Sequence, residues 1–204
     1  MKETASSQRR SPTMNVKHTL NKQKSMSWPA FQLMRMVMNI KKRFRNIEEE
    51  IHLAGIEKGF QVLDFGCGLG FNTIPAANAV GKEGRVFALD ISELAIAIVK
   101  KKTAKNKLNH VEFIQSDCDT GLEDKSIDLV YLHNTLPLVK QKLQVLKEIT
   151  RVIKTGGKLS YMSRLGSRIY GENTLSNSKL KELLSPDFTL KTEKDGHFIF
   201  ERIS

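Results

Sequence analysis

The residues with the clearest chemical potential are three glycines that lie next to an acid. Gly66, Gly68 and Gly70 follow an apolar run that ends around Asp64. Glycine tolerates positive φ and lets a ligand approach the backbone closely. The helical pattern behind the glycines would add free N–H groups and the positive end of a helix dipole. At the carboxyl end of a strand, such a loop is where open α/β sheets bind ligands.

The glycine spacing separates this loop from two common nucleotide-binding loops. A dinucleotide site has Gly-x-Gly-x-x-Gly, but here the pattern is Gly-x-Gly-x-Gly, and Phe71 stands where the last glycine would be. A P-loop would need Gly-Lys-Ser/Thr, which does not follow. Asp90 ends the next apolar run, and a carboxylate there can accept hydrogen bonds from both hydroxyls of a ribose. Asp117 follows a third apolar run. The glycine loop followed by Asp90 and Asp117 in this order is much stronger evidence for a nucleoside site than the loop alone.

The elements that must position these residues alternate along the chain. Short apolar runs at 60–65, 86–89, 111–115, 127–132 and 158–162 are separated by helical patterns at 70–80, 93–105 and 139–153. Such β-α units predict a parallel sheet with helices on both faces. A helix that ends over 180–184 is followed by two strand-like runs around Asp195-Gly196, a hairpin signal. We therefore predict an α/β fold, a Rossmann-like three-layer sandwich, whose seven-stranded sheet is mostly parallel with an antiparallel C-terminal hairpin strand.

Composition excludes several classes of protein. A chain of 204 residues has the length of one domain and can bury a hydrophobic core without disulfides or bound metals to stabilise it. Its two cysteines, Cys67 and Cys118, cannot build a disulfide scaffold or a zinc finger. No run of about 18 apolar residues exists, and the first 17 residues lack an apolar signal core. We expect a cytoplasmic protein with no metal site.

The positive charge is concentrated at one end of the chain. The net charge is +11, and residues 1–45 hold eleven of the 33 Lys and Arg but only one acid. We expect residues 1–26 to be a disordered basic arm, residues 27–50 an N-terminal lid helix with a broad apolar face, and residues 51–204 the α/β domain. The arm also has features of a transit peptide, and Met26 is an alternative start.

These motifs resemble those of the class I S-adenosylmethionine-dependent methyltransferases, in particular the type 11 and ubiquinone/menaquinone-biosynthesis group. Residues 64–70 match the first family motif, 87–92 the second, 115–118 the adenine-side motif and 128–134 the fourth. The resemblance covers residues 58–163 well and the rest of 28–204 loosely. It implies the same fold, S-adenosyl-L-methionine as cofactor, and an N-terminal helix that covers the cofactor.

The resemblance also implies the cofactor-binding residues. Asp90 would bind the ribose, Asp117 would accept from the exocyclic amine of adenine, and Cys118 would add a backbone N–H. Asp64 either holds the loop or contacts the amino group of the cofactor. Asp119 is an alternative to Asp117 for binding the adenine amine. The expected cofactor-binding set is Asp64, Gly66, Cys67, Gly68, Gly70, Asp90, Ile91, Asp117, Cys118 and His133.

His133 and Asn134 are the catalytic candidates, because they stand where substrate-facing residues occur in this fold. His133 could act as a base near neutral pH, or it could be a cofactor-side or packing residue. The acid and the histidine that follow this motif in many relatives are absent. Alternation leaves open which face of the sheet Tyr161 occupies. His110 and His197 are expected at the surface.

The mechanism follows from an activated methyl group. The enzyme need only hold a nucleophile in line and exclude water, so a base is optional. We expect methyl transfer to a small-molecule acceptor. Alternatives are an RNA or protein methyltransferase that uses the basic arm, a lipid-surface methyltransferase with residues 28–44 at the interface, and a cofactor-binding protein without transfer activity. The Asn/Asp-Pro-Pro-Tyr motif of RNA amine methyltransferases is absent at 134–137.

Overall fold

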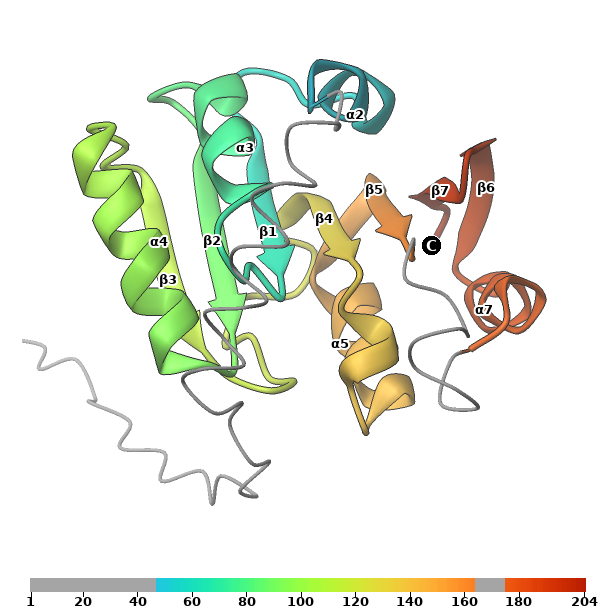
Figure 1. Ribbon diagram of the computed structural model, residues 1–204. Coiled ribbons are helices and arrows are strands. Elements are labelled where there is room, and N and C mark those ends of the chain that lie inside the picture. The colour runs from blue at the N-terminus through green and yellow to red at the C-terminus, as the bar shows by residue number, and fades with distance from the viewer. Residues whose placement is uncertain (1–46, 164–174) are drawn as a thin grey trace, which may run out of the picture.

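The computed structural model describes residues 47–163 and 175–204. They form one seven-stranded sheet in the order β3-β2-β1-β4-β5-β7-β6 (Figure 1). Strands β1 to β5 are parallel, while β7 runs antiparallel to both of its neighbours, β5 and β6. The predicted fold is confirmed. The expected basic arm and most of the expected lid helix lie outside the described residues, and so do residues 164–174.

The bounds of the elements show where each loop begins. The strands are β1 (Gln61–Phe65), β2 (Arg85–Asp90), β3 (Val111–Gln115), β4 (Ile127–His133), β5 (Ile153–Met162), β6 (Phe188–Lys194) and β7 (His197–Arg202). The helices are α2 (Ile47–Ala54), α3 (Thr73–Val80), α4 (Glu93–Lys105), the 3₁₀ turn η1 (Leu136–Leu138), α5 (Lys142–Val152) and α7 (Asn177–Leu184). The expected domain boundary at residue 51 falls inside α2 and stays a prediction.

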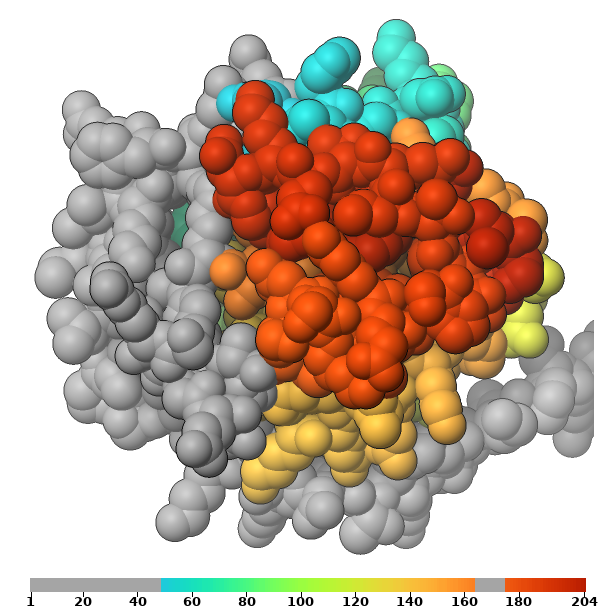
Figure 2. Space-filling view, turned by 90° about the vertical axis from the view of Figure 1, so that its right-hand side faces the viewer, coloured from blue at the N-terminus to red at the C-terminus, as the bar shows by residue number. Residues whose placement is uncertain are grey.

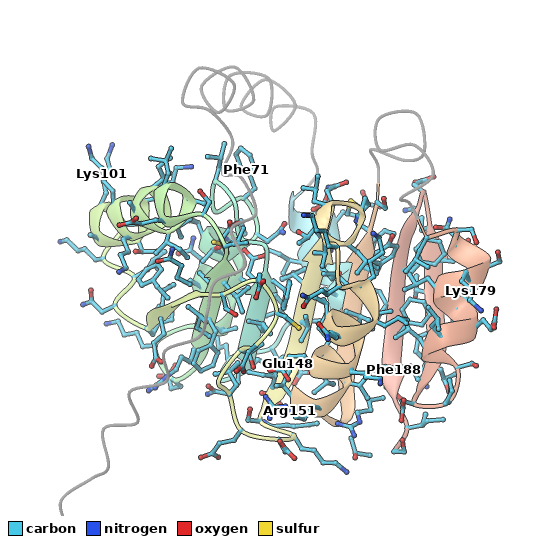
Figure 3. The ribbon with its side chains drawn as sticks, turned by 90° about the horizontal axis from the view of Figure 1, so that it is seen from below. Phe71, Lys101, Glu148, Arg151, Lys179 and Phe188 are labelled. Atoms are coloured by element: carbon cyan, nitrogen blue, oxygen red, sulfur yellow. The ribbon has the colours of Figure 1, made fainter. Side chains whose placement is uncertain are left out.

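The sheet separates two apolar layers. Ile149 of α5 and Leu180 of α7 are buried against one face, and Ala76 of α3 and Val99 of α4 are buried against the other. Successive side chains of a strand alternate between the faces, so neighbouring residues of β4 serve both layers. Figure 3 shows α4 and α5 on opposite sides of the sheet. Among the described residues, no helix is both long and apolar enough to cross a bilayer.

The chain differs from expectation where α5 meets β5. The helix was expected to reach residue 153 and the strand to begin at 158, but α5 ends at Val152 and β5 begins at Ile153. Ile153 pairs with Ile127, and the register then shifts before Leu129. Gly156, with φ of +78°, lies in this irregular stretch. Gly156 and its neighbour Gly157 therefore lie within an irregular strand.

The C-terminal hairpin closes one edge of the molecule. Its turn residues, Asp195 and Gly196, have φ of +50° and +74°, which fits the two-residue turn that Asp-Gly predicts. Phe198 and Phe200 of β7 are buried in the core. Figure 2 shows β6, β7 and α7 together covering this side of the molecule. Lys194, next to the turn, forms an ion pair with Glu49 of α2 at 2.5 Å.

Candidate active site

The structure brings the sequence-predicted residues to one edge of the sheet. Parallel strands end at a common edge, and there Asp64 lies near the end of β1 and Asp90 at the end of β2. Asp117 follows the end of β3, and His133 is the last residue of β4. This edge is where ligands bind in open α/β sheets.

Asp64 joins β1 to the start of α3. Asp64 is 1% exposed, and its carboxylate accepts hydrogen bonds from Thr73 Oγ1 at 2.6 Å and from Asn72 Nδ2 at 3.4 Å. Residues 70–72 are turns, so α3 begins at Thr73 rather than at residue 70. Asp64 therefore fixes the end of the glycine loop, which was one of its two expected roles.

The three glycines of the loop have different surroundings. All have positive φ, at +81° for Gly66, +50° for Gly68 and +76° for Gly70. A Cβ on Gly66 would lie 2.2 Å from the Thr135 hydroxyl, and one on Gly70 would lie 3.3 Å from Val99 of α4. Among the residues that the structure describes, a Cβ on Gly68 would meet nothing closer than the Gly66 carbonyl oxygen at 4.0 Å. Gly66 and Gly70 serve packing, whereas Gly68 borders space that no described residue fills.

Asp90 bridges the loop to the next helix. Its Oδ2 accepts from the Gly68 N–H at 2.9 Å, and its Oδ1 accepts from the Ser92 N–H at 2.8 Å. Burial raises the pKa of Asp90 above its ordinary value, and these two hydrogen bonds oppose that effect. A carboxylate has about four acceptor positions, so further hydrogen bonds can reach it. Ile91 beside it is 39% exposed.

Both cysteines lie in the loops of this edge, and neither thiol is activated. Burial and the charges of Asp64 and Asp90 raise the pKa of Cys67. Burial and nearby acids also raise the pKa of the half-buried Cys118. The Cys118 N–H, which the resemblance assigns to the adenine, donates to Ser116 Oγ at 3.3 Å. Reactive cysteines have lowered pKa values, so these two are loop residues rather than nucleophiles.

The loop after β3 is clamped to α5. Glu148 Oε1 accepts from the Thr120 N–H at 2.9 Å, and Arg151 donates to the Leu122 carbonyl at 2.8 Å. Arg151 also forms ion pairs with Glu148 at 2.7 Å and with Asp124 at 2.5 Å. Figure 3 shows Glu148 and Arg151 on the same side of the molecule. Glu148 and Arg151 were not predicted from the sequence, although an acid and a base three residues apart on a helix are a recognisable signal of an ion pair.

The two candidate acids of this loop are placed differently. Asp119 Oδ1 accepts from the Gly121 N–H at 2.9 Å, which makes a local turn. Asp117 is half-buried and lies two residues after Gln115, the last residue of β3. This geometry leaves Asp117 as the stronger candidate for the adenine amine, and its role stays a prediction.

His133 lies in a buried polar group at the end of β4. It is 7% exposed, and its Nε2 is 2.8 Å from Ser160 Oγ, which is 2.7 Å from His197 Nε2. The expectation that His197 is a surface residue is wrong, because it is 3% exposed in β7 against β5. His110 is half-buried, with Nε2 2.8 Å from the Ala77 carbonyl. Tyr161 is buried in the layer of α5, on the face opposite Tyr131 and Ser160.

Asn134 begins the loop after β4 in a strained conformation. Its φ is +55°, which Asn tolerates better than most residues, and its N–H donates to the Met162 carbonyl at 2.7 Å. Thr135 follows, and its hydroxyl donates a hydrogen bond to the His133 carbonyl oxygen at 3.1 Å. The loops after β1 and β4 meet where Thr135 packs on Gly66.

Comparison with known proteins identifies the family. The family model described as "Methyltransferase domain" matches residues 56–201. The chain belongs to this methyltransferase family. The resemblance to class I S-adenosylmethionine-dependent methyltransferases is thereby confirmed, and membership of that class implies S-adenosyl-L-methionine as the cofactor of this methyltransferase.

Individual relatives match part of this methyltransferase. A demethylmenaquinone methyltransferase of Bacillus mycoides is 35% identical over 130 residues, which are 63% of this chain and 55% of the relative. The chain thus spans about half the length of that relative. A solved SAM-dependent methyltransferase from Aquifex aeolicus shares the fold at 24% identity, with a TM-score of 0.68 over 78% of this chain and 90% of the other.

The fold alone does not fix the reaction of this methyltransferase. The solved structure of the [4+2]-cyclase SpnF matches with a TM-score of 0.64 and 19% identity, over 76% of this chain and 60% of the other. A fold can carry different chemistry on the same scaffold, so the reaction must be argued from the residues of the site.

Proposed function

We propose that this methyltransferase binds S-adenosyl-L-methionine at the carboxyl edge of β1 to β4 and transfers its methyl group to a small-molecule acceptor. The observation that supports the proposal is the hydrogen bond from the Gly68 N–H to Asp90, beside space that is empty among the described residues. A ribose placed there would contact the Asp90 carboxylate, which can accept further hydrogen bonds, and the backbone of Gly68, which has no side chain in the way.

The residues around this point fit the remainder of the nucleoside. Ile91 exposes apolar surface next to Asp90, as a flat adenine ring would require. Asp117 would accept from the exocyclic amine, and the Cys118 N–H would exchange its 3.3 Å hydrogen bond to Ser116 for one to the ring. Gly66, Cys67 and Gly70 hold the loop, and Asp64 anchors it to α3.

The transfer needs little from the protein beyond position and proton removal. S-adenosyl-L-methionine supplies an activated methyl group. His133 and Asn134, at the end of β4, are the proposed catalytic residues: His133 takes the proton of the acceptor, and Asn134 holds the turn that aims this loop. A neutral imidazole suits this role near pH 7.

The acceptor that we propose is a small aromatic molecule with an acidic hydroxyl. The relatives named demethylmenaquinone methyltransferases support this class, although the chain matches only part of their length. A phenolic hydroxyl must lose its proton before its ring or oxygen can attack a methyl group, and this gives His133 a task. A cytoplasmic location, as expected from the sequence, is part of the same proposal.

Calorimetric titration tests the cofactor site directly. We expect S-adenosylmethionine and S-adenosylhomocysteine to bind with micromolar affinity, and NAD and ATP not to bind. Asp90→Ala should weaken binding by roughly 1.5–3 kcal/mol, because hydrogen bonds to a charged group are lost. Asp187→Ala, an acid before β6, is the matched control and should bind normally. Binding of NAD instead, or unchanged affinity in folded Asp90→Ala, would overturn the placement.

A further inference from the structure

The loop that carries Asp117 crosses from β3 to β4 without regular secondary structure. Residues 116–126, all within the described part of the chain, make this connection without a helix or a strand. Parallel strands are usually joined by a helix, which satisfies its own backbone hydrogen bonds. Cys118 and Leu122 instead pack as half-buried side chains against the apolar layer that contains α5. The backbone of this loop therefore needs hydrogen-bond partners from elsewhere in the fold.

Two side chains of α5 supply such partners. Glu148 Oε1 accepts hydrogen bonds from the Thr120 N–H at 2.9 Å and from the Thr120 hydroxyl at 2.5 Å. Arg151 Nη1 donates to the Leu122 carbonyl at 2.8 Å, and the Leu122 N–H donates to Thr120 Oγ1 at 3.2 Å. Figure 3 shows Glu148 and Arg151 beside this loop. Together these two residues form the α5 clamp.

The two halves of the α5 clamp fix each other. Arg151 Nε donates to Glu148 Oε2 at 2.8 Å, and Arg151 Nη2 donates to Glu148 Oε1 at 2.7 Å. Such a bidentate pair holds both side chains in one geometry. Thr120 is 4% exposed and the Glu148 side chain 13%, so water competes little for these hydrogen bonds. The α5 clamp therefore fixes the backbone of Thr120 relative to the helix.

The α5 clamp holds the chain close to the groups proposed to bind adenine. Thr120 follows Cys118 by two residues, and Cys118 follows Asp117 directly. Burial and the charge of Glu148 raise the pKa of the Cys118 thiol, so the Glu148 carboxylate acts on this residue electrostatically. A binding group must be held within about 0.5 Å of its productive position. The position of Thr120 therefore affects how Asp117 and the Cys118 N–H face a base.

We infer that Glu148 and Arg151 are positioning residues that set the preference of the cofactor site for adenine over hypoxanthine. Adenine offers an amine to the Asp117 carboxylate and a ring nitrogen to the Cys118 N–H. Hypoxanthine reverses this pattern, because it has a carbonyl and a ring N–H at these two positions. A site rejects the reversed pattern only while its own polar groups stay in place. The inference rests on the proposed function, which assigns Asp117 and Cys118 to adenine.

Calorimetric titration of the full chain with S-adenosylhomocysteine and S-inosylhomocysteine tests the inference without any acceptor. We expect the wild type to bind the adenosyl compound at least about 100-fold more tightly, because the inosyl compound loses two hydrogen bonds. In Glu148→Ala and Arg151→Met, this ratio of Kd values should fall at least about tenfold, through weaker binding of the adenosyl compound. Glu148→Gln keeps an acceptor for the Thr120 N–H, so it should retain part of the ratio.

Arg202→Met is the matched control for Arg151→Met. Arg202 is a buried arginine of β7 that also donates to a main-chain carbonyl, that of Ile153, where β5 begins and thus at the edge opposite the site. We expect Arg202→Met to lower stability and to leave the ratio of Kd values unchanged. Equal losses of affinity for both compounds in Glu148→Ala would indicate a general effect on the fold and would overturn the inference.

Amide hydrogen exchange of the protein without cofactor checks the physical cause. The Thr120 N–H donates to Glu148 and the Leu122 N–H to Thr120, so both amides depend on the α5 clamp. We expect these two amides to exchange at least about tenfold faster in Glu148→Ala than in the wild type. Unchanged exchange would mean that the loop keeps its position without Glu148, contrary to the inference.

Asp117→Asn separates the inference from the proposed function. The amide of this variant can donate to the hypoxanthine carbonyl, so the ratio of Kd values should fall although the α5 clamp is intact. If Asp117→Asn lowers the ratio and Glu148→Ala does not, the inference fails and the proposed function stands. If the wild type binds neither compound, or Asp117→Asn keeps the full ratio, the proposed adenine site fails and the inference fails with it.

Discussion

Gly68 and Gly59 share a backbone conformation but not a location. Their φ values are +50° and +84°, and a Cβ on either would meet no described atom closer than 4.0 Å. Gly68→Ala and Gly59→Ala should each cost about 1–2 kcal/mol of stability, because a side chain disfavours positive φ. Only Gly68→Ala should also weaken S-adenosylmethionine binding, by at least about tenfold, or about 1.4 kcal/mol. Thermal unfolding and calorimetry measure the two effects.

A parallel loss of binding in Gly59→Ala would show that stability, not the ligand, connects the two measurements. Unchanged binding in Gly68→Ala would mean that the open space beside Gly68 is not where the cofactor lies. Gly66 cannot serve in this comparison, since its Cβ would overlap Thr135.

Single residues differ in how far the sequence could predict their roles. Asp90 stood at the end of an apolar run after a glycine loop, and a local motif of this kind was enough to place it at the carboxyl edge. His197 was misplaced because its partners are distant in sequence: Ser160 and His133 lie on strands that come to it only through the sheet order. The sequence pattern of a short strand does not predict which other strands will lie beside it in the sheet.

At the scale of elements, the ion pair of α5 anchors a loop of the site. Although burial raises it, hydrogen bonds from Arg151 and Thr120 hold the pKa of Glu148 at about 2, against an ordinary value of 4.5. A carboxyl group whose pKa is lower in the folded state stabilises the fold above the unfolded value and loses this effect as it protonates. We expect Glu148→Gln to cost about 1.5–3 kcal/mol at pH 7.

The pH dependence checks this assignment. The difference in unfolding free energy between wild type and Glu148→Gln should shrink as the pH falls from about 4.5 towards 2. Glu182→Gln is the control, because Glu182 pairs with Lys179 in an exposed position on α7 and should contribute less than about 1 kcal/mol. A difference that stays constant down to pH 2 would contradict a charge-based clamp. Urea titrations at several pH values give the numbers.

Elements were predictable where local pattern and tertiary structure agree. The bounds of α4 and β3 matched the sequence, since a capping serine begins α4 and β3 is a short apolar run. The junction of α5 and β5 was not, because Ile153 fits a helix by its spacing but pairs with Ile127 in the sheet. The irregular register that follows depends on the partner strand, which local periodicity does not contain.

The whole molecule should unfold as one unit, because one sheet supports both apolar layers. Ile149 of α5 and Leu129 of β4 are fully buried in different layers. Ile149→Ala and Leu129→Ala should each lower stability by about 2–5 kcal/mol. Both should shift a single transition, seen together by circular dichroism and calorimetry. Two separate transitions in either variant would show that the layers fold independently.

Fold class was the feature of the whole molecule that the sequence predicted best. Alternating strands and helices predicted the parallel part, and Asp195-Gly196 predicted the hairpin that adds the reversed strand. The domain limits and the basic arm stay predictions, because residues 1–46 lie outside the described part of the chain. Charge and composition predict what kind of segment this is, but they do not predict where it lies relative to the domain.

The contact between Gly66 and Thr135 has a consequence for the order of events in catalysis. It wedges the hydroxyl side chain of one loop into the space left by a missing Cβ in another, and the second loop adjoins His133. Because the Thr135 side chain fills this space, a movement of the glycine loop on cofactor binding would also move the loop after β4, on the acceptor side. We expect cofactor and acceptor to bind in a compulsory sequence, with the cofactor first and its spent form released last.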